Sequence, residues 1–149
     1  SDRRSAAERW LARSAGIGDA SVRAALIDHA LAIIEAPGHA DIFAPGALAE
    51  APIAAVVGGD VIAGTIDRLL VREDSVRIID FKTGRGVPAS PQGIPPAHLR
   101  QMAAYVAALE VIFPGRRIEA ALLYTSGPKI MTLDAALLAP HKPGYAQAQ

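Results

Sequence analysis

The chain has 149 residues, of which 51% are hydrophobic, and its 15 basic and 15 acidic residues give a formal net charge of zero. A chain of this size can bury a core as one domain. The absence of cysteine excludes disulfide bonds and thiolate zinc sites. No apolar run approaches the ~18 residues of a membrane span and no signal-peptide core opens the chain, so we expect a cytoplasmic protein with no membrane partner.

Two helices are predicted at the start of the chain, over residues 5–15 and 20–36. Asp19 is a suitable N-cap for the second helix, and Pro37 directly after it favours its end there. A loop or short turn is predicted over residues 41–49.

The rest of the chain combines short branched runs with one longer helical pattern. Strands bounded by turn residues are predicted over 52–57, 61–72, 76–82, 118–125 and 129–133. A loop rich in Gly and Pro over 84–96 leads to a predicted helix over 98–113, which ends at Pro114. The order α, βββ, α, ββ predicts an α/β fold with a mixed central sheet flanked by helices.

Two carboxylates and a lysine fall on neighbouring predicted strands. Asp80 and Lys82 are two residues apart and therefore share one face of their strand, while Phe81 points the other way, into the core. A tight turn between the strands forms an antiparallel hairpin in which Asp67 and Asp80 can converge. Two converging carboxylates repel and need a cation, and such hard oxygen ligands suit Mg²⁺ or Mn²⁺.

Each of these features alone is more often structural. A single Asp at a strand end is usually a solvated turn residue, and Asp-x-Lys on a strand is usually a surface ion pair. The helix that follows changes this balance, because Gln101 and Tyr105 are four residues apart and share one of its faces. The combination favours a metal site.

Three motifs, in this order along the chain, resemble those of the RecB-type branch of the PD-(D/E)xK nucleases. They are Gly-x-Ile-Asp-Arg at 64–68, Ile-Asp-Phe-Lys-Thr-Gly at 79–84 and Gln-Met-x-x-Tyr at 101–105. The resemblance covers roughly residues 50–133, and the ordered combination is more specific than any one motif. Its last part, over 108–125, resembles the C-terminal nuclease domain of AddA, the helicase–nuclease subunit of bacterial double-strand-break repair.

This resemblance implies a restriction-endonuclease-like fold and a role for each motif residue. It implies that Asp67 and Asp80 hold the metal together with the backbone carbonyl of Phe81. It also implies that Lys82 assists the attacking water, and that the Gln and Tyr of the third motif position the substrate or the lysine.

Other residues are weaker candidates. Glu50 precedes Pro52 as in the Glu-x-Pro of RecB-type nucleases, and is either an auxiliary acid or a surface residue before the strand. Three arginines near the site in sequence are candidate DNA contacts, with ordinary solvated surface as the alternative: Arg68, Arg85 and Arg100. Because the net charge is zero, we expect weak DNA binding by the chain alone.

RecB-type nucleases also carry an upstream Gly-Thr-x-x-His helix whose histidine binds the metal, and this chain lacks it. We therefore expect residues 1–149 to be one nuclease domain, an N-terminally trimmed C-terminal fragment of a larger helicase–nuclease with weak or no activity alone. Its expected parts are a helical lead-in (1–49), a nuclease core (50–134) and a frayed tail (140–149). His29 or, with less support, His39 is a candidate substitute ligand, although a histidine on an apolar helix face is more often packed or rim-exposed.

Motifs for other chemistries are missing. There is no P-loop, so this segment should not bind ATP, and there is neither a Gly-x-Ser-x-Gly elbow nor a His-Glu-x-x-His pair. We expect Mg²⁺- or Mn²⁺-dependent hydrolysis of DNA single strands or ends, within an exonuclease domain that works with the rest of its helicase chain and an AddB-like subunit. The alternative is a catalytically silent nuclease-fold module for DNA binding or subunit docking, against which the intact Asp67, Asp80 and Lys82 argue.

Overall fold

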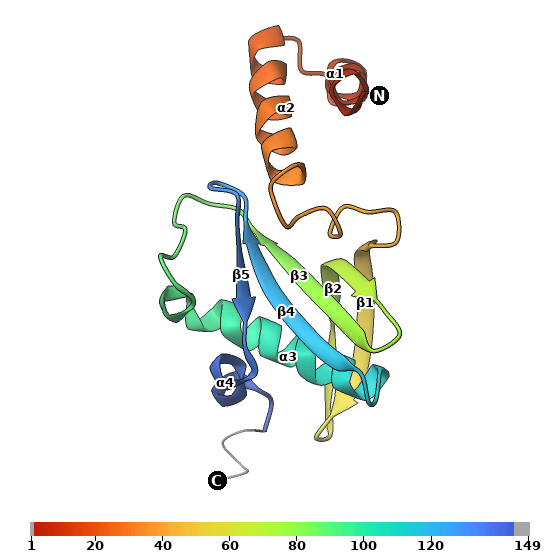
Figure 1. Cartoon of the computed structure of the whole chain (residues 1–149), viewed down its shortest axis with the longest axis vertical. Helices are drawn as coiled ribbons and strands as arrows, with labels where there is room; N and C mark the ends of the chain where they lie inside the picture. Colours follow the sequence, from red (N-terminus) through yellow and green to blue (C-terminus); the bar gives the residue numbers. More distant parts are fainter. Residues whose placement is uncertain (1, 145–149) are drawn as a thin grey trace. The chain divides into compact units, whose positions relative to one another are not determined.

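The structure is a computed structural model that describes residues 2–144, and it forms two compact units, Ser1–Phe43 and Ala44–Gln149. The first unit is a pair of packed helices, α1 (Arg3–Arg13) and α2 (Ala20–Ile34) (Figure 1). The predicted N-cap is confirmed, because the Asp19 carboxylate accepts hydrogen bonds from the first backbone N–H groups of α2. The second helix ends two residues before the predicted 36, since the residue before Pro37 disfavours helical backbone.

The second unit contains a five-stranded sheet in the order β1-β2-β3-β4-β5. The strands are β1 (Leu48–Val57), β2 (Asp60–Val71), β3 (Ser75–Lys82), β4 (Arg117–Tyr124) and β5 (Lys129–Leu133). All neighbours are antiparallel except β3 and β4, which are parallel and are joined through a helix, as a parallel pair requires. The predicted α/β class with a mixed sheet flanked by helices is confirmed.

The first strand begins earlier than predicted. It starts at Leu48, within the expected loop 41–49, so Pro52 lies inside the strand and not at its start. A proline is tolerated there because β1 is an edge strand of the sheet. Its hairpin with β2 turns at Gly58 and Gly59, which both have positive φ (59° and 95°), as a tight two-residue hairpin turn favours.

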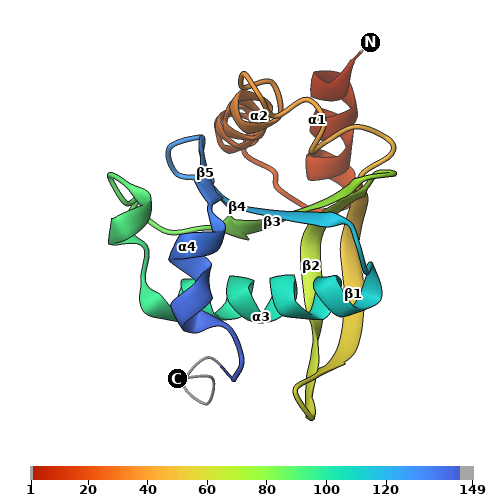
Figure 2. The same cartoon turned by 60° about the horizontal axis from the view of Figure 1, so that its bottom comes forward.

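Helix α3 (Pro96–Ile112) lies along one face of the sheet and forms the core with it (Figure 2). Its buried side chains include Leu99, Met102, Val106 and Leu109, which join a cluster with strand residues such as Val76, Ile78, Ala120 and Leu122. Each fully buried side chain of this size contributes about 1.5–3 kcal/mol. This packing fixes the face of α3 that is turned toward β2 and β3.

The end of the chain is more ordered than predicted. A short helix α4 (Ala135–Leu138) and a 3-10 helix η2 (Ala139–His141) follow β5, and another 3-10 helix, η1 (Pro91–Gly93), lies in the loop before α3. The frayed tail expected from residue 140 is therefore wrong at its start, because Asp134 caps α4 and Lys142 Nζ lies 2.7 Å from Glu110 Oε1. The rest of that expectation, residues 145–149, falls outside the described residues. Between residues 2 and 144, no helix has the length and apolar character required to cross a bilayer.

Candidate active site

The β2–β3 hairpin brings Asp67 and Asp80 together. The antiparallel pairs run from Val71↔Val76 to Arg68↔Ile79, and one further step in this register places Asp67 opposite Asp80. The backbone N–H of Phe81 donates a hydrogen bond of 2.7 Å to Asp67 Oδ2. The Asp67 side chain thus occupies the edge of β3 at the point where backbone pairing with β2 ends.

Asp80 is a buried carboxylate, with only 7% of the residue exposed. Burial raises its pKa above the usual range, the nearby Asp67 carboxylate raises it further, and the Lys82 ammonium opposes both effects. Lys82 Nζ lies 2.6 Å from Asp80 Oδ2, as expected for residues two apart on one strand face. Phe81 between them is half-buried and does not join the core, contrary to the prediction.

Helix α3 supplies two further side chains. Lys82 Nζ donates a hydrogen bond of 2.9 Å to Gln101 Oε1, so the helix holds the lysine from above the sheet. One helical turn later, Tyr105 packs directly on Gly64 of β2: a Cβ atom at this glycine would lie 2.5 Å from the Tyr105 hydroxyl oxygen. The absence of a side chain at residue 64 therefore lets the tyrosine reach the strand that carries Asp67.

The oxygen atoms at this site fit a hard divalent cation. Phe81 donates its N–H toward Asp67, whereas the Lys82 carbonyl accepts at 3.0 Å from the N–H of Thr125, the residue that follows β4. Because successive residues of a strand point their backbone groups to alternate edges, the Phe81 carbonyl is directed to the same edge as its N–H. Two carboxylates and this carbonyl are the ligand types that suit Mg²⁺ or Mn²⁺.

Glu50 on β1 lies opposite Asp67 on β2, but it does not form a metal-ligand cluster with the other carboxylates. The β1–β2 pairs on either side are Ala49↔Arg68 and Ala51↔Ile66, and the pair between them, Glu50 with Asp67, is not formed. Glu50 is exposed and has a φ of 49°, an uncommon value for a residue with a side chain. Among residues 2–144 no group of three or more His, Asp or Glu side chains is placed to hold a metal.

The sequence profile described as the PD-(D/E)XK nuclease superfamily matches residues 3–144. The chain belongs to this superfamily. Among solved structures, one titled "Crystal structure of SSO0001" is similar to this chain, with 16% identity and a TM-score of 0.42, and the alignment covers 97% of this chain and 71% of that chain. A comparison with curated protein sequences found no match.

The arginines that were predicted to contact DNA occupy different environments in this PD-(D/E)XK domain. Arg68 follows Asp67 on β2 and is half-buried, with interactions within the chain. Arg85 lies in the loop after β3 and Arg100 on α3, and both are exposed. The structure thus leaves two arginines exposed to solvent, Arg85, three residues after Lys82, and Arg100, directly before Gln101.

Neither histidine of the first unit joins a metal-ligand group. His29 is exposed on α2, and the described residues contain no three-membered cluster that would include it. His39 is buried, and its Nδ1 is 2.5 Å from the carbonyl oxygen of Ile33. This contact ties the loop after α2 to the end of the helix, which is a structural role.

His98 is the residue that the sequence reasoning missed. It lies on the first turn of α3, three residues before Gln101, so the two share a helix face. Its Nδ1 is enclosed and has no hydrogen-bond partner within residues 2–144. Burial lowers the pKa of His98 below its usual value, the Lys82 charge lowers it further, and the Asp80 charge opposes this. The i, i+3 spacing between His98 and Gln101 is the sequence feature that could have identified His98 as a residue near the site.

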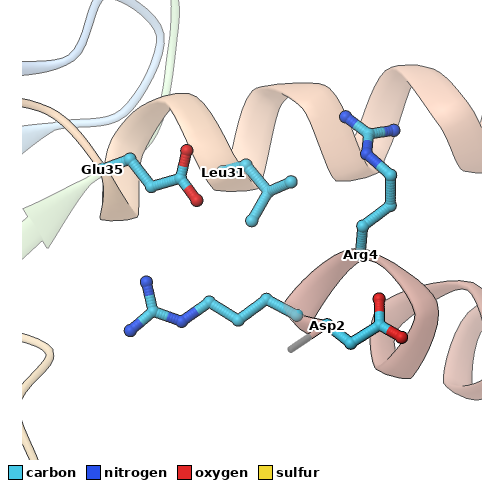
Figure 3. A pocket seen from close by; sticks show the side chains of 5 residues that line it. Asp2, Arg4, Leu31 and Glu35 are labelled. Atoms are coloured by element: carbon cyan, nitrogen blue, oxygen red, sulfur yellow. The ribbon is translucent and has the colours of Figure 1, made fainter.

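A further hollow lies away from these residues. A cavity of about 680 Å³ lies in the helical unit, lined by Leu31 of α2, by Glu35 directly after this helix, and by Asp2 and Arg4 at the start of α1 (Figure 3). Two of its charged groups have structural partners, since Asp2 caps α1 and Arg4 forms an ion pair with Asp28. The carboxylates of β2 and β3 therefore indicate the candidate active site better than the volume of a cavity does.

Proposed function

We propose that this domain is a Mg²⁺- or Mn²⁺-dependent deoxyribonuclease of the RecB type, acting on DNA single strands or ends. The observation that carries the proposal is the group of Asp67, Asp80 and Lys82 on one hairpin of a PD-(D/E)XK fold, with Gln101 bonded to the lysine. The Gln-to-Lys hydrogen bond supports the RecB-type assignment in particular, because it joins two motifs that are 19 residues apart in the chain.

A wider context extends this proposal. We infer a nuclease domain within an AddA-like helicase–nuclease that acts in double-strand-break repair in the cytoplasm, with an AddB-like partner subunit. In that context the motor would deliver the DNA strand, so the domain needs little affinity of its own. The zero net charge of the chain is consistent with this arrangement.

Each residue has a proposed task. The two carboxylates and the Phe81 carbonyl would hold the cation, which when bound polarises the scissile phosphate and lowers the pKa of a water. Lys82 orients that water or offsets the charge that develops on the phosphate. Gln101 holds Lys82 in position through its hydrogen bond, and Tyr105 packs against β2 beside the site.

The test is cleavage of linear single-stranded DNA in Mn²⁺, measured for the 149-residue chain, for the full-length protein and for the Asp80→Asn variant of each. We expect cleavage that depends on Mn²⁺ and on Asp80, and stronger cleavage by the full-length protein. Absence of cleavage by the full-length wild-type protein would overturn the proposal and favour the catalytically silent module.

A further inference from the structure

The first turn of α3 presents a polar group for which residues 2–144 provide no hydrogen-bond partner. His98 is half-buried, its Nδ1 is enclosed, and neither ring nitrogen has a hydrogen bond to another group in the described part of the chain. An enclosed polar atom without a partner carries a desolvation cost. Such a residue invites an explanation beyond packing.

The position of His98 relative to the site is fixed by α3. Gln101 lies on the same helix face and accepts a hydrogen bond from Lys82 Nζ, so this face is turned toward the lysine. The direction in which the two charges act agrees with this position, since the Lys82 charge lowers the pKa of His98 and the Asp80 charge raises it. The histidine therefore flanks the candidate active site.

Two features near His98 attract an anion, the start of α3 and the Lys82 ammonium, while the Asp80 carboxylate offsets part of the Lys82 charge. The start of a helix carries a partial positive charge, and α3 has no acidic residue in its first turn to balance it. Lys82 adds a full positive charge nearby. His98 Nε2, unlike Nδ1, is not enclosed, so it is the nitrogen that remains available to a ligand. A neutral imidazole can donate a hydrogen bond through Nε2–H.

We propose that His98 is a substrate-binding residue, which donates a hydrogen bond from Nε2 to a phosphate oxygen of the nucleic-acid strand beside Lys82. This inference rests on the proposed nuclease function and adds a phosphate contact to it. The contact belongs to the ground state of the bound strand. It therefore affects DNA affinity even when no metal is present.

The experiment measures binding of a fluorescein-labelled oligothymidylate by anisotropy in metal-free buffer with EDTA, where cleavage cannot occur. We expect His98→Ala to weaken affinity on the order of tenfold, as for loss of a hydrogen bond to a charged group. His98→Gln, whose amide N–H can replace Nε2–H, should stay within about threefold of wild type. Circular dichroism confirms that each variant is folded.

His141→Ala is the matched control, because His141 lies in η2 beside Lys142, which pairs with Glu110 near the other end of α3. Wild-type affinity of His98→Ala would overturn the proposal, and so would equal weakening by His98→Ala and His98→Gln. If wild type cleaves DNA but His98→Ala binds it normally, only the His98 contact fails. If the full-length wild type does not cleave DNA, the proposed function itself fails.

Discussion

The ammonium of Lys82 lies 2.6 Å from Oδ2 of Asp80, an oxygen that is also a candidate metal ligand. In this arrangement the lysine is the cation that compensates the buried carboxylate. A divalent ion at Asp80 would compete with Lys82 for the same oxygen. The hydrogen bond from Lys82 Nζ to Gln101 provides a second anchor that keeps the ammonium at the site when that competition occurs.

The carboxylates should be required for metal binding but not for folding. Asp80→Asn and Asp67→Asn remove charge with little change in volume, and an Asn at residue 67 can still accept the Phe81 N–H. We expect Mn²⁺ affinity, measured by calorimetry, to fall by more than the ~10–100-fold that is typical when a residue hydrogen-bonded to a metal ligand is replaced. Asp60→Asn, an exposed acid at the β1–β2 turn, is the control. Near wild-type Mn²⁺ affinity in either variant would show that the metal assignment is wrong.

Lys82 should act on the chemical step more than on the metal. A cation cannot ligate a cation, so Lys82→Met should reduce the cleavage rate by about 100-fold or more without lowering Mn²⁺ affinity, which should stay the same or rise because the ammonium no longer competes for Asp80. Lys129→Met is the matched control, because Lys129 Nζ donates its hydrogen bond to the carbonyl oxygen of Ala89, in the loop before α3. Parallel losses of turnover and of metal affinity would contradict this role.

Gly64 should be required for the position of Tyr105. A methyl group at residue 64 would lie 2.5 Å from the tyrosine hydroxyl oxygen and 2.9 Å from its Cζ, so Gly64→Ala must displace the ring or the strand. We expect a loss of about 1–3 kcal/mol in the free energy of unfolding, the usual cost of overpacking. Thermal and urea unfolding measure it.

Two variants make the Gly64 result specific. Gly46→Ala is the control, since a Cβ there meets no atom within 4 Å and the backbone has no positive φ. Combining Gly64→Ala with Tyr105→Ala should cost less than the sum of the two single changes, because the clash is removed. Strict additivity would mean that the two residues do not interact.

Local patterns in the sequence were sufficient for the hairpin that carries the carboxylates. The branched and aromatic residues within 76–82 predict the strand, and the turn before it sets which residues face each other across the hairpin, so both depend on neighbours in the chain. The i, i+4 spacing of Gln101 and Tyr105 likewise predicted a shared helix face. The hydrogen bond to Lys82 then follows once α3 packs on the sheet.

Features that depend on contacts between distant segments were not predictable in the same way. The buried positions of β2 change phase between Ile66 and Leu69, and the left-handed backbone of Glu50 lies beside this change on β1. No propensity in the sequence of either strand indicates it. The enclosure of His98 Nδ1 likewise depends on what surrounds the start of α3, which the helical pattern alone does not define.

His98 should also give the fold a pH dependence with a definite sign. Its folded-state pKa is lowered from 6.5, chiefly by burial and secondly by the Lys82 charge, so below pH 6.5 the unfolded chain binds more protons at this residue than the folded chain. The free energy of unfolding should therefore decrease as pH falls from about 6.5 toward the lower folded-state pKa. The melting temperature at about pH 7.5 and about pH 5.5 measures this decrease, and His98→Gln should make it smaller. His141→Gln, the matched histidine at the other end of α3, should leave the decrease as in wild type. An unchanged decrease in His98→Gln would mean that the imidazole is not destabilised in its charged form, contrary to its enclosed position beside Lys82.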